Sequence, residues 1–198
     1  MVQTSLNNVS IRLKSGGHSF SASELGAEVR SASQPVEVVL FTAKTTLVPA
    51  EFFDGEHAAD YLAEVGLAPS ADECAVYSKA VNGVVAVMAI NKACYDTLKV
   101  SIPAGVAFAS PLLGDSTLQK GSVIHLEERV MYVNVYDGGL RFAEAFECEN
   151  DADVLYYLAT VNEVYGIYNI YNMYARATGD VKHLQKLLKP IFKNLVCE

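Results

Sequence analysis

An Asn-Gly pair between two strand-like segments places the strongest constraint on how this chain folds. Asn82-Gly83 separates residues 74–81 from the apolar run Val84–Ile90. Both central positions of a type I′ turn need positive φ, which asparagine and glycine adopt more readily than other residues. The sequence therefore predicts a tight β-hairpin over residues 74–90.

The first forty residues are predicted to form strands. Val9–Leu13 and residues 18–23 alternate apolar and polar side chains on either side of the turn Ser15-Gly16-Gly17, as in a hairpin. A short strand is predicted near residues 27–31. Val36–Phe41, which is rich in β-branched and aromatic side chains, is predicted as a further strand.

The second half of the chain repeats this pattern. Residues 130–136 and 140–146 are strand-like and are joined by Asp137-Gly138-Gly139. Asp-Gly is the expected pair at the centre of a type I′ turn, so a hairpin is predicted here as well. Residues 168–174 also alternate as a strand.

Four helices are predicted from their capping residues and apolar spacing. They run from Asp54 to Gly66, from Asn91 to about Val100, from a cap at Asn150 or Asp151 to Tyr165, and from Val181 to Leu195 with Pro190 as an interruption. Hairpins that alternate with helices indicate a mixed α/β fold (α+β mixed), with two hairpin-rich sheets and flanking helices.

A polar, glycine-bearing segment, residues 112–122, is the best candidate for a joint between two halves. We therefore expect two domains, residues 1–119 and residues 120–198.

Charge and hydropathy limit the partners and the compartment. The chain has 15 Lys and Arg against 23 Asp and Glu, a formal net charge of −8. This charge repels a phosphate backbone, so we do not expect nucleic acid as a partner. The N-terminus lacks a secretory signal, and the longest apolar run is far shorter than the roughly 20 residues that span a bilayer. We expect a cytoplasmic protein with no transmembrane segment and no peripheral membrane contact.

The sequence signatures of common enzymes are absent. The chain has no nucleophile elbow, no P-loop, no dinucleotide-binding glycine motif and no His-Glu-x-x-His. The acids Glu127 and Glu128 are explained by a solvated strand rim, although such a pair can also bind a cation. The cysteines lack metal-ligand spacing and are predicted to be reduced, inert thiols. We therefore lean toward a protein that is not an enzyme, without catalytic residues, metal or cofactor.

Three motifs occur in a fixed order along the chain. Residues 47–54 (LVPAEFFD) precede Tyr61-Leu62, residues 139–146 precede Asp153 and residues 156–158 (YYL), and residues 178–180 (TGD) precede Leu187-Leu188. Their order and spacing, from about Val9 to Leu188, resemble the bacterial domain of unknown function 3822 family.

This resemblance implies an actin-like, ribonuclease H-like fold, a duplication of two similar lobes. Residues 1–119 would form a reduced N-terminal lobe and residues 120–198 a C-terminal lobe that is shorter than expected. The fold is similar to the cytoplasmic scaffold proteins of pilus and type II secretion machines. The family has no established activity, so the resemblance itself implies none. Our preferred interpretation is a degenerate, non-catalytic interaction or scaffold module.

The same resemblance leaves a nucleotide-binding switch or weak ATPase, with ATP and Mg²⁺, as the alternative. Active members carry an acid on each of two glycine-containing hairpins, and here only the second hairpin has one. Gly179 would approach the adenine, but Asp180 replaces a second glycine. The residues of this alternative site are Ser15, Gly16, Gly17, Asp137, Gly138, Gly139 and Gly179.

Two features of the C-terminal half suit a protein partner. Lysines spaced along the last predicted helix form a basic stripe, and tyrosines, which suit interfaces, cluster just before it. Both features also suit an ordinary helix packed on a sheet. The candidate partner surface comprises Tyr156, Tyr157, Tyr168, Tyr171, Lys182, Lys186, Lys189 and Lys193. The partner would be another protein or a second copy of the chain.

Overall fold

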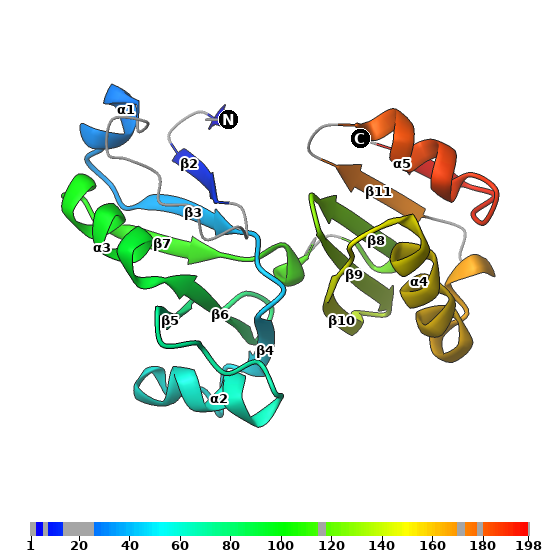
Figure 1. Ribbon diagram of the computed structural model, residues 1–198, viewed down its shortest axis with the longest axis horizontal. Helices are drawn as coiled ribbons and strands as arrows, with labels where there is room; N and C mark the ends of the chain where they lie inside the picture. The colour runs from blue at the N-terminus through cyan, green and yellow to red at the C-terminus, as the bar shows by residue number, and fades with distance from the viewer. Residues whose placement is uncertain are drawn as a thin grey trace. The chain divides into compact units, whose positions relative to one another are not determined.

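The chain contains two compact units, Met1–Leu113 and Gly114–Glu198. The computed structural model in Figure 1 describes residues 3–5, 8–13, 26–114, 118–169, 173–177 and 180–197. The sequence predicts the division between residues 119 and 120. The units instead divide after Leu113, ahead of a strand that begins at Lys120.

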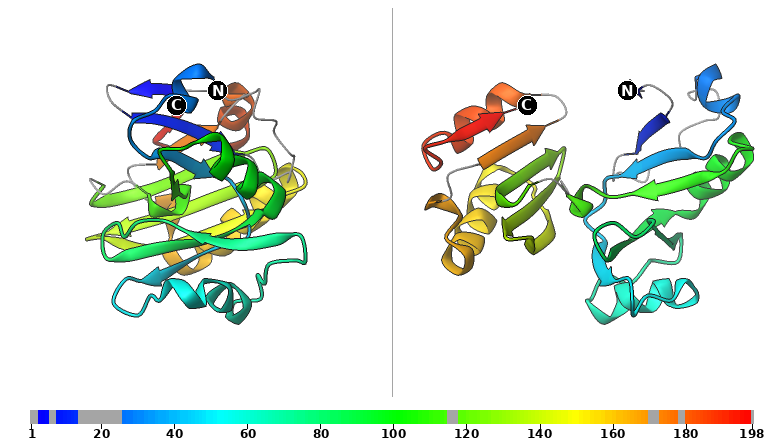
Figure 2. Two further views of the ribbon diagram at one scale, coloured as in Figure 1. Left: turned by 90° about the vertical axis from the view of Figure 1, so that its left-hand side faces the viewer. Right: turned by 180° about the vertical axis from the view of Figure 1, so that it is seen from behind.

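Unit 1 contains two sheets among its described residues (Figures 1 and 2). In the order β1-β2-β3-β7, the first sheet comprises β1 (Gln3–Ser5), β2 (Asn8–Leu13), β3 (Val36–Leu40) and β7 (Val106–Ala109). Only the β1–β2 pair of this sheet is antiparallel. The second sheet is antiparallel and comprises β4 (Thr45–Pro49), β6 (Val84–Asn91) and β5 (Glu73–Tyr77), in that order.

Short helices cover these sheets. They are α1 (Ala27–Arg30), η2 (Gly55–His57), α2 (Ala58–Glu64), α3 (Lys92–Ser101) and η3 (Pro111–Leu113). Cys94 and Leu98 of α3 pack in one core with β3 and β6, and Leu62 of α2 packs in another against Val85 and Val87 of β6. β6 therefore contributes to both cores of unit 1.

The turn at Asn82-Gly83 is confirmed. Both residues have positive φ, 53° and 78°, and Val81 and Val84 exchange backbone hydrogen bonds of 2.8 and 3.0 Å. The helix caps of unit 1 are confirmed too. The Asp54 carboxylate accepts from the Glu56 N–H at 3.0 Å, and Asn91 Oδ1 accepts from two N–H groups at the start of α3.

Three predictions for unit 1 need correction. The short strand expected at residues 27–31 is wrong, because α1 occupies this segment. β4 is not among the predicted strands, because Val48-Pro49 is typical of a turn; Pro49 is tolerated because β4 is an edge strand and Pro49 is its last residue. β7 has no counterpart in the prediction. The second strand of the first hairpin, residues 18–23, lies outside the described residues.

The described residues of unit 2 form one sheet in the order β10-β9-β8-β11-β12. Its elements are β8 (Lys120–Glu127), β9 (Val130–Asp137), β10 (Leu140–Glu147), α4 (Asp151–Tyr165), η4 (Ile167–Asn169), β11 (Met173–Ala177), α5 (Val181–Leu188) and β12 (Leu195–Cys197). β8, β9 and β10 form an antiparallel meander, whereas β11 lies parallel to both β8 and β12.

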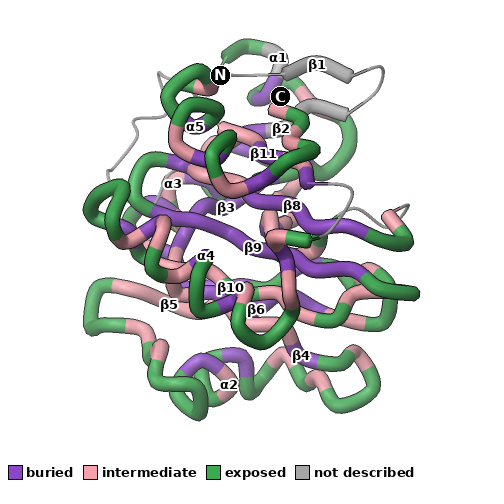
Figure 3. The backbone as a smooth tube through the Cα atoms, turned by 90° about the vertical axis from the view of Figure 1, so that its right-hand side faces the viewer, coloured by how far each residue is buried: buried purple, intermediate pink, exposed green. Residues whose placement is uncertain are grey.

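Both long helices of unit 2 pack on the same face of this sheet. Alternate strand residues, including Ile124, Met131 and Val133, share one core with Leu158 of α4 and Leu184 of α5. Figure 3 shows β9 buried along most of its length, and the burial runs from Val130 to Tyr136. This central strand carries the core of unit 2.

The start of α4 is fixed by a capping box. Asn150 Oδ1 accepts from the Ala152 and Asp153 N–H groups, and the Asp153 carboxylate accepts from the Asn150 N–H at 3.2 Å. The helix ends at Gly166, whose φ of 63° a glycine adopts without strain. The predicted boundaries of this helix are therefore confirmed.

Replacing this cap should weaken the unit measurably. Asn150→Ala is expected to lower the free energy of unfolding by about 1 kcal/mol, because two N–H groups at the helix start lose their acceptor. Asn150→Asp keeps an accepting oxygen and should lose only a few tenths of a kcal/mol. Urea denaturation followed by circular dichroism compares the two variants, and equal losses would contradict the capping role.

The end of the chain departs from prediction. The helix expected to reach Leu195 ends at Leu188, and the chain turns at Pro190, which lacks an N–H and clashes with a preceding helical turn. Leu195 begins β12 instead. The strand predicted over residues 168–174 is wrong at Tyr168, which lies in η4, and is confirmed at Met173 and Tyr174.

Candidate functional site

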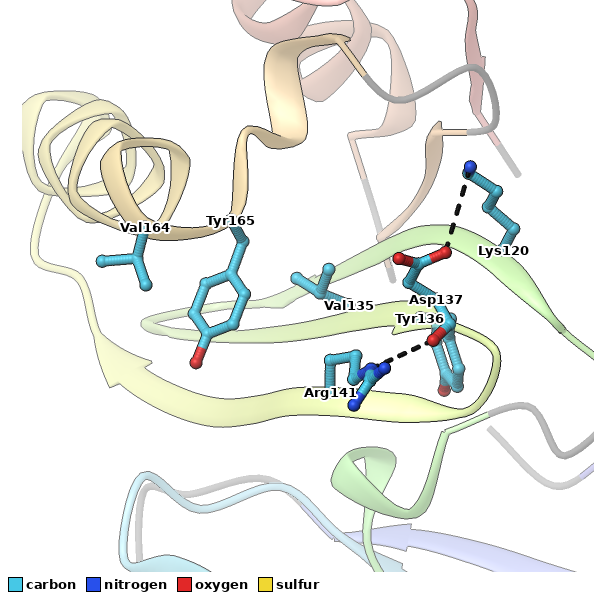
Figure 4. A pocket seen from close by; sticks show the side chains of 7 residues that line it. All are labelled: Lys120, Val135, Tyr136, Asp137, Arg141, Val164 and Tyr165. Carbon is cyan, nitrogen blue, oxygen red and sulfur yellow. Dashed lines mark hydrogen bonds and ion pairs between the residues drawn. The ribbon is translucent and has the colours of Figure 1, made fainter.

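A pocket of about 570 Å³ lies in unit 2 beside the turn between β9 and β10 (Figure 4). Its volume suits a small ligand or a partner's side chains. The hairpin and the end of α4 supply its walls. Its lining residues are Lys120, Val135, Tyr136, Asp137, Arg141, Val164 and Tyr165.

The polar wall of this pocket is built around Asp137. Lys120 is the register partner of Asp137 across β8 and β9, and its Nζ lies 3.9 Å from Asp137 Oδ1. Arg141 Nε donates to the Asp137 carbonyl oxygen at 3.0 Å, which turns the guanidinium back toward the hairpin (Figure 4). Both ion-pair side chains are largely exposed, so this pair contributes little to stability.

The apolar wall comes from α4. Tyr165 points toward the hairpin in Figure 4, and its ring lies 4.9 Å from the Phe142 ring of β10, centroid to centroid. Val164 lines the pocket from an exposed position on α4. The last turn of α4 is thus tied to β10 by an aromatic contact.

The turn itself differs from the predicted type I′ turn centred on Asp137-Gly138. Positive φ falls on Gly138 (69°) and Gly139 (134°), and Asp137 remains the last residue of β9. The Gly138 N–H donates to the Gln119 carbonyl at 2.9 Å, and the Asp137 N–H donates to the Gly139 carbonyl at 3.0 Å. These amides are already hydrogen-bonded, whereas a phosphate-binding loop needs free N–H groups.

The other residues of the alternative nucleotide site lie outside the described residues. Ser15, Gly16, Gly17 and Gly179 fall in segments 14–25 and 178–179. Of this alternative site the structure describes Asp137, Gly138 and Gly139, which lie beside Lys120 and Arg141. Nucleotide binding stays a prediction.

Apart from Asp151 at its first position, which pairs with His183, the exposed surface of α4 is nearly uncharged. We call this surface the α4 outer face. It comprises Ala152, Tyr156, Ala159, Thr160, Glu163 and Val164, all exposed, and only Glu163 carries a charge. Tyr156 is 66% exposed and Val164 is 72% exposed. A helix on a soluble surface usually shows charged and polar side chains there.

The predicted tyrosines divide into two groups. Tyr157 stacks on Phe146 with ring centroids 4.6 Å apart, and Tyr168 meets Phe192 edge-on at 5.3 Å, so both pack against the core. The Tyr156 ring lies edge-on to Tyr157 at 5.4 Å and faces outward. Tyr171 lies outside the described residues.

The four predicted lysines do not share one helix. Lys182 and Lys186 lie on α5, Lys189 is its C-cap residue and Lys193 lies in the turn beyond Pro190. All four are exposed. The sequence analysis assumed a longer helix, and Pro190 is the reason that the stripe is interrupted.

An ion pair joins the start of α5 to the start of α4. His183 Nε2 lies 2.9 Å from Asp151 Oδ1, and this hydrogen bond raises the pKa of His183 above its ordinary value. A second pair lies within the sheet, where His125 Nε2 and Glu127 Oε2 are 3.8 Å apart. Glu127 is only 3% exposed, so the solvated rim expected for it is wrong. Among the residues that the structure describes, no three His, Cys, Asp or Glu side chains gather as a metal site.

The cysteines suit the predicted role of inert thiols. Burial raises the pKa of Cys94 and of Cys148 to about 11, so both thiols stay protonated at neutral pH. The described cysteines form no disulfide.

A smaller pocket of about 330 Å³ in unit 1 includes Ser78, whose hydroxyl already donates to the Lys79 carbonyl and accepts from the Ala86 N–H.

Sequence reasoning found Asp137 through its Asp-Gly-Gly turn but missed its neighbours. Lys120 reaches the site through strand register, and Tyr165 reaches it because α4 crosses the sheet. No local motif marks either residue.

No helix in the described part of the chain has the length and apolar character needed to cross a membrane.

Comparisons with known proteins bear on the family and the fold of the chain. A family model described as "Protein of unknown function (DUF3822)" matches residues 30–193. No curated protein matches the chain. A solved Bacteroides thetaiotaomicron protein with an actin-like ATPase fold and unknown function is 22% identical, with a TM-score of 0.65, over 83% of this chain and 68% of that one. This likeness confirms the predicted mixed α/β, actin-like fold.

A second solved structure is more distant. The cytoplasmic domain of EpsL, an inner membrane component of the type II secretion system of Vibrio cholerae, is 16% identical to the chain. The match covers 85% of this chain and 81% of that domain, with a TM-score of 0.44.

Proposed function

Since this chain belongs to the DUF3822 family of proteins of unknown function, we propose from its own surface that it is a non-catalytic interaction module. It has an actin-like fold and binds a protein partner through the α4 outer face. The observation that carries this proposal is the exposure of Tyr156 and Val164 on a helix side with a single charge.

The geometry of Tyr156 supports an anchoring role. Its ring rests edge-on against Tyr157, and Tyr157 stacks on Phe146 of β10. A ring held in this way loses little conformational entropy when a partner covers it, and tyrosine offers both apolar area and a hydroxyl. Such anchors carry much of the binding energy in protein interfaces.

Site-specific photo-crosslinking tests the proposal. A photoreactive phenylalanine analogue replaces Tyr156 in the cells that naturally make the protein, and a discrete adduct with another protein is expected. Val164→Asp on the same face should lower the adduct yield about tenfold, because it places a charge in an apolar contact. The matched control carries the analogue at Tyr77 of unit 1, which is 46% exposed. Equal adducts at both positions, or none at position 156, would overturn the proposal.

Nucleotide binding has less support than this module. The Asp137 N–H is hydrogen-bonded within the β9–β10 hairpin and the Gly138 N–H to the Gln119 carbonyl, so phosphate would have to displace both acceptors. Lys120 and Arg141 bring positive charge to the same turn, but Asp137 lies between them.

A further inference from the structure

No strand of the described residues pairs with the outer edge of β10. β10 is the first strand in the order β10-β9-β8-β11-β12, so within the described chain it pairs with β9 alone. It spans Leu140–Glu147, and Figure 1 shows it at the margin of unit 2. An edge strand of this length presents a row of backbone N–H and C=O groups to any second strand.

The sequence of this edge is nearly a palindrome. About Glu144 as its centre, the apolar residues repeat in mirror order and the two ends carry opposite charges. The residues are Arg141, Phe142, Ala143, Glu144, Ala145, Phe146 and Glu147. In an antiparallel pair related by a two-fold axis, each residue before the centre faces the residue equally far after it.

We propose that unit 2 forms a homodimer in which β10 pairs antiparallel with β10 of a second copy, with the two-fold axis at Glu144. Arg141 of each copy then lies near Glu147 of the other, Phe142 faces Phe146, and Ala143 faces Ala145. Opposite charges and aromatic pairs across strands both stabilise such a ladder. The same surface patch serves both copies, as a two-fold interface requires.

The phenylalanines are already positioned for this contact. Phe142 packs on Tyr165 and Phe146 stacks on Tyr157, so α4 fixes both rings before any dimer forms. The two alanines between them are half-buried, and their small side chains add little bulk beside the edge. The edge is therefore ordered in advance, which lowers the entropic cost of pairing.

Two features keep this pairing weak and specific. A bulge places Arg141 as an extra residue between Leu140 and Phe142, so the regular edge begins at Phe142 and Arg141 acts through its long side chain. Glu144 meets its own copy at the axis, and like charges directly opposite are unfavourable. Partial burial already raises the pKa of the Glu144 carboxyl above its ordinary value. We expect a dissociation constant of roughly 1–100 µM, typical of a small interface.

This inference goes beyond the proposed function, because it uses the β10 edge and leaves the α4 outer face open to another protein. The partner site on the α4 outer face and the β10 dimer can therefore be disproved independently of each other. Loss of adducts at Tyr156 leaves the dimer unaffected, and a monomeric chain leaves the adducts unaffected.

Charge exchange on the full chain tests the dimer by sedimentation velocity over a range of concentrations. Arg141→Glu and Glu147→Arg each replace two attractive contacts with two repulsive ones, so each should weaken dimerisation about tenfold. The double variant Arg141→Glu, Glu147→Arg restores the attraction and should return the affinity to within about threefold of the original. Glu144→Gln should tighten the dimer, because it removes the repulsion at the axis.

Matched controls separate this register from general charge effects. Glu64→Arg and Lys99→Glu make the same charge changes at exposed positions of unit 1 and should leave the dimer unchanged. If Arg141→Glu disturbs the turn at Asp137, Glu147→Arg still tests the same charge contact from the other end of β10. A monomer at all concentrations, a dimer insensitive to the single exchanges, or a double variant that stays weak would each overturn the proposal.

Discussion

Replacing Leu158 with alanine is expected to lower the free energy of unfolding of unit 2 by about 2–5 kcal/mol. Leu158 is fully buried at the centre of the face that α4 presents to the sheet. Its side chain belongs to the core formed with Ile124, Met131 and Val133. Truncation removes buried methyl groups and leaves a cavity that the sheet cannot fill without moving.

Urea denaturation measures this loss, and hydrogen exchange by mass spectrometry assigns it to unit 2. Val164→Ala on the same helix is the matched control. Val164 is 72% exposed, so its truncation should change stability by no more than about 0.5 kcal/mol. A loss below about 1 kcal/mol for Leu158→Ala, or faster exchange confined to unit 1, would contradict the described core.

Gly114→Ala is expected to destabilise unit 2 by about 2–4 kcal/mol, through a strained backbone and a direct clash. Gly114 has a φ of +66°, and an added Cβ would clash directly with the Tyr136 hydroxyl oxygen. The Tyr136 ring is buried on β9, so it has little room to move away.

Gly138→Ala provides the control for the backbone contribution. Its φ is +69° and no atom lies within 4 Å of the added Cβ, so it should cost only about 1–2 kcal/mol. The difference between the two variants is the cost of the clash. Removing the hydroxyl with Tyr136→Phe should recover part of that difference in a double-mutant cycle. Equal losses for Gly114→Ala and Gly138→Ala would show that the close approach to Tyr136 carries no cost.

The sequence predicted those elements whose signals are local. Asn82-Gly83 forms its hairpin because two adjacent residues adopt positive φ at low cost. The start of α4 follows from Asn150 and Asp153, which satisfy N–H groups within four residues of each other. Such features need no knowledge of the rest of the fold.

Elements that depend on distant partners were missed. β8 contains glycine, serine and histidine and has weak strand character of its own, yet it lies between β9 and β11 and pairs with both. β4 was not predicted as a strand, because it ends in Pro49, a residue typical of turns. In both cases the neighbouring strand, rather than the local composition, decides the outcome.

The candidate surfaces show the same limit. The mirror order around Glu144 can be read from the sequence, but it matters only because β10 lies at the edge of its sheet. Val164 resembles any other apolar residue of α4 until the structure shows it on the outer side of the helix. Strand order and helix orientation are long-range properties, and a single sequence does not encode them in a short motif.

The parallel pairing of β11 with β8 determines the order in which the elements of unit 2 are expected to fold. Met173 pairs with Ser122 across about fifty intervening residues, whereas β8, β9 and β10 are joined by short turns. Closing the long loop between β8 and β11 costs chain entropy before the contacts between these strands form. The meander is therefore expected to form first, and β11, α5 and β12 to dock later. During synthesis, β12 leaves the ribosome after β11, and until it arrives β11 remains the exposed border of the growing sheet.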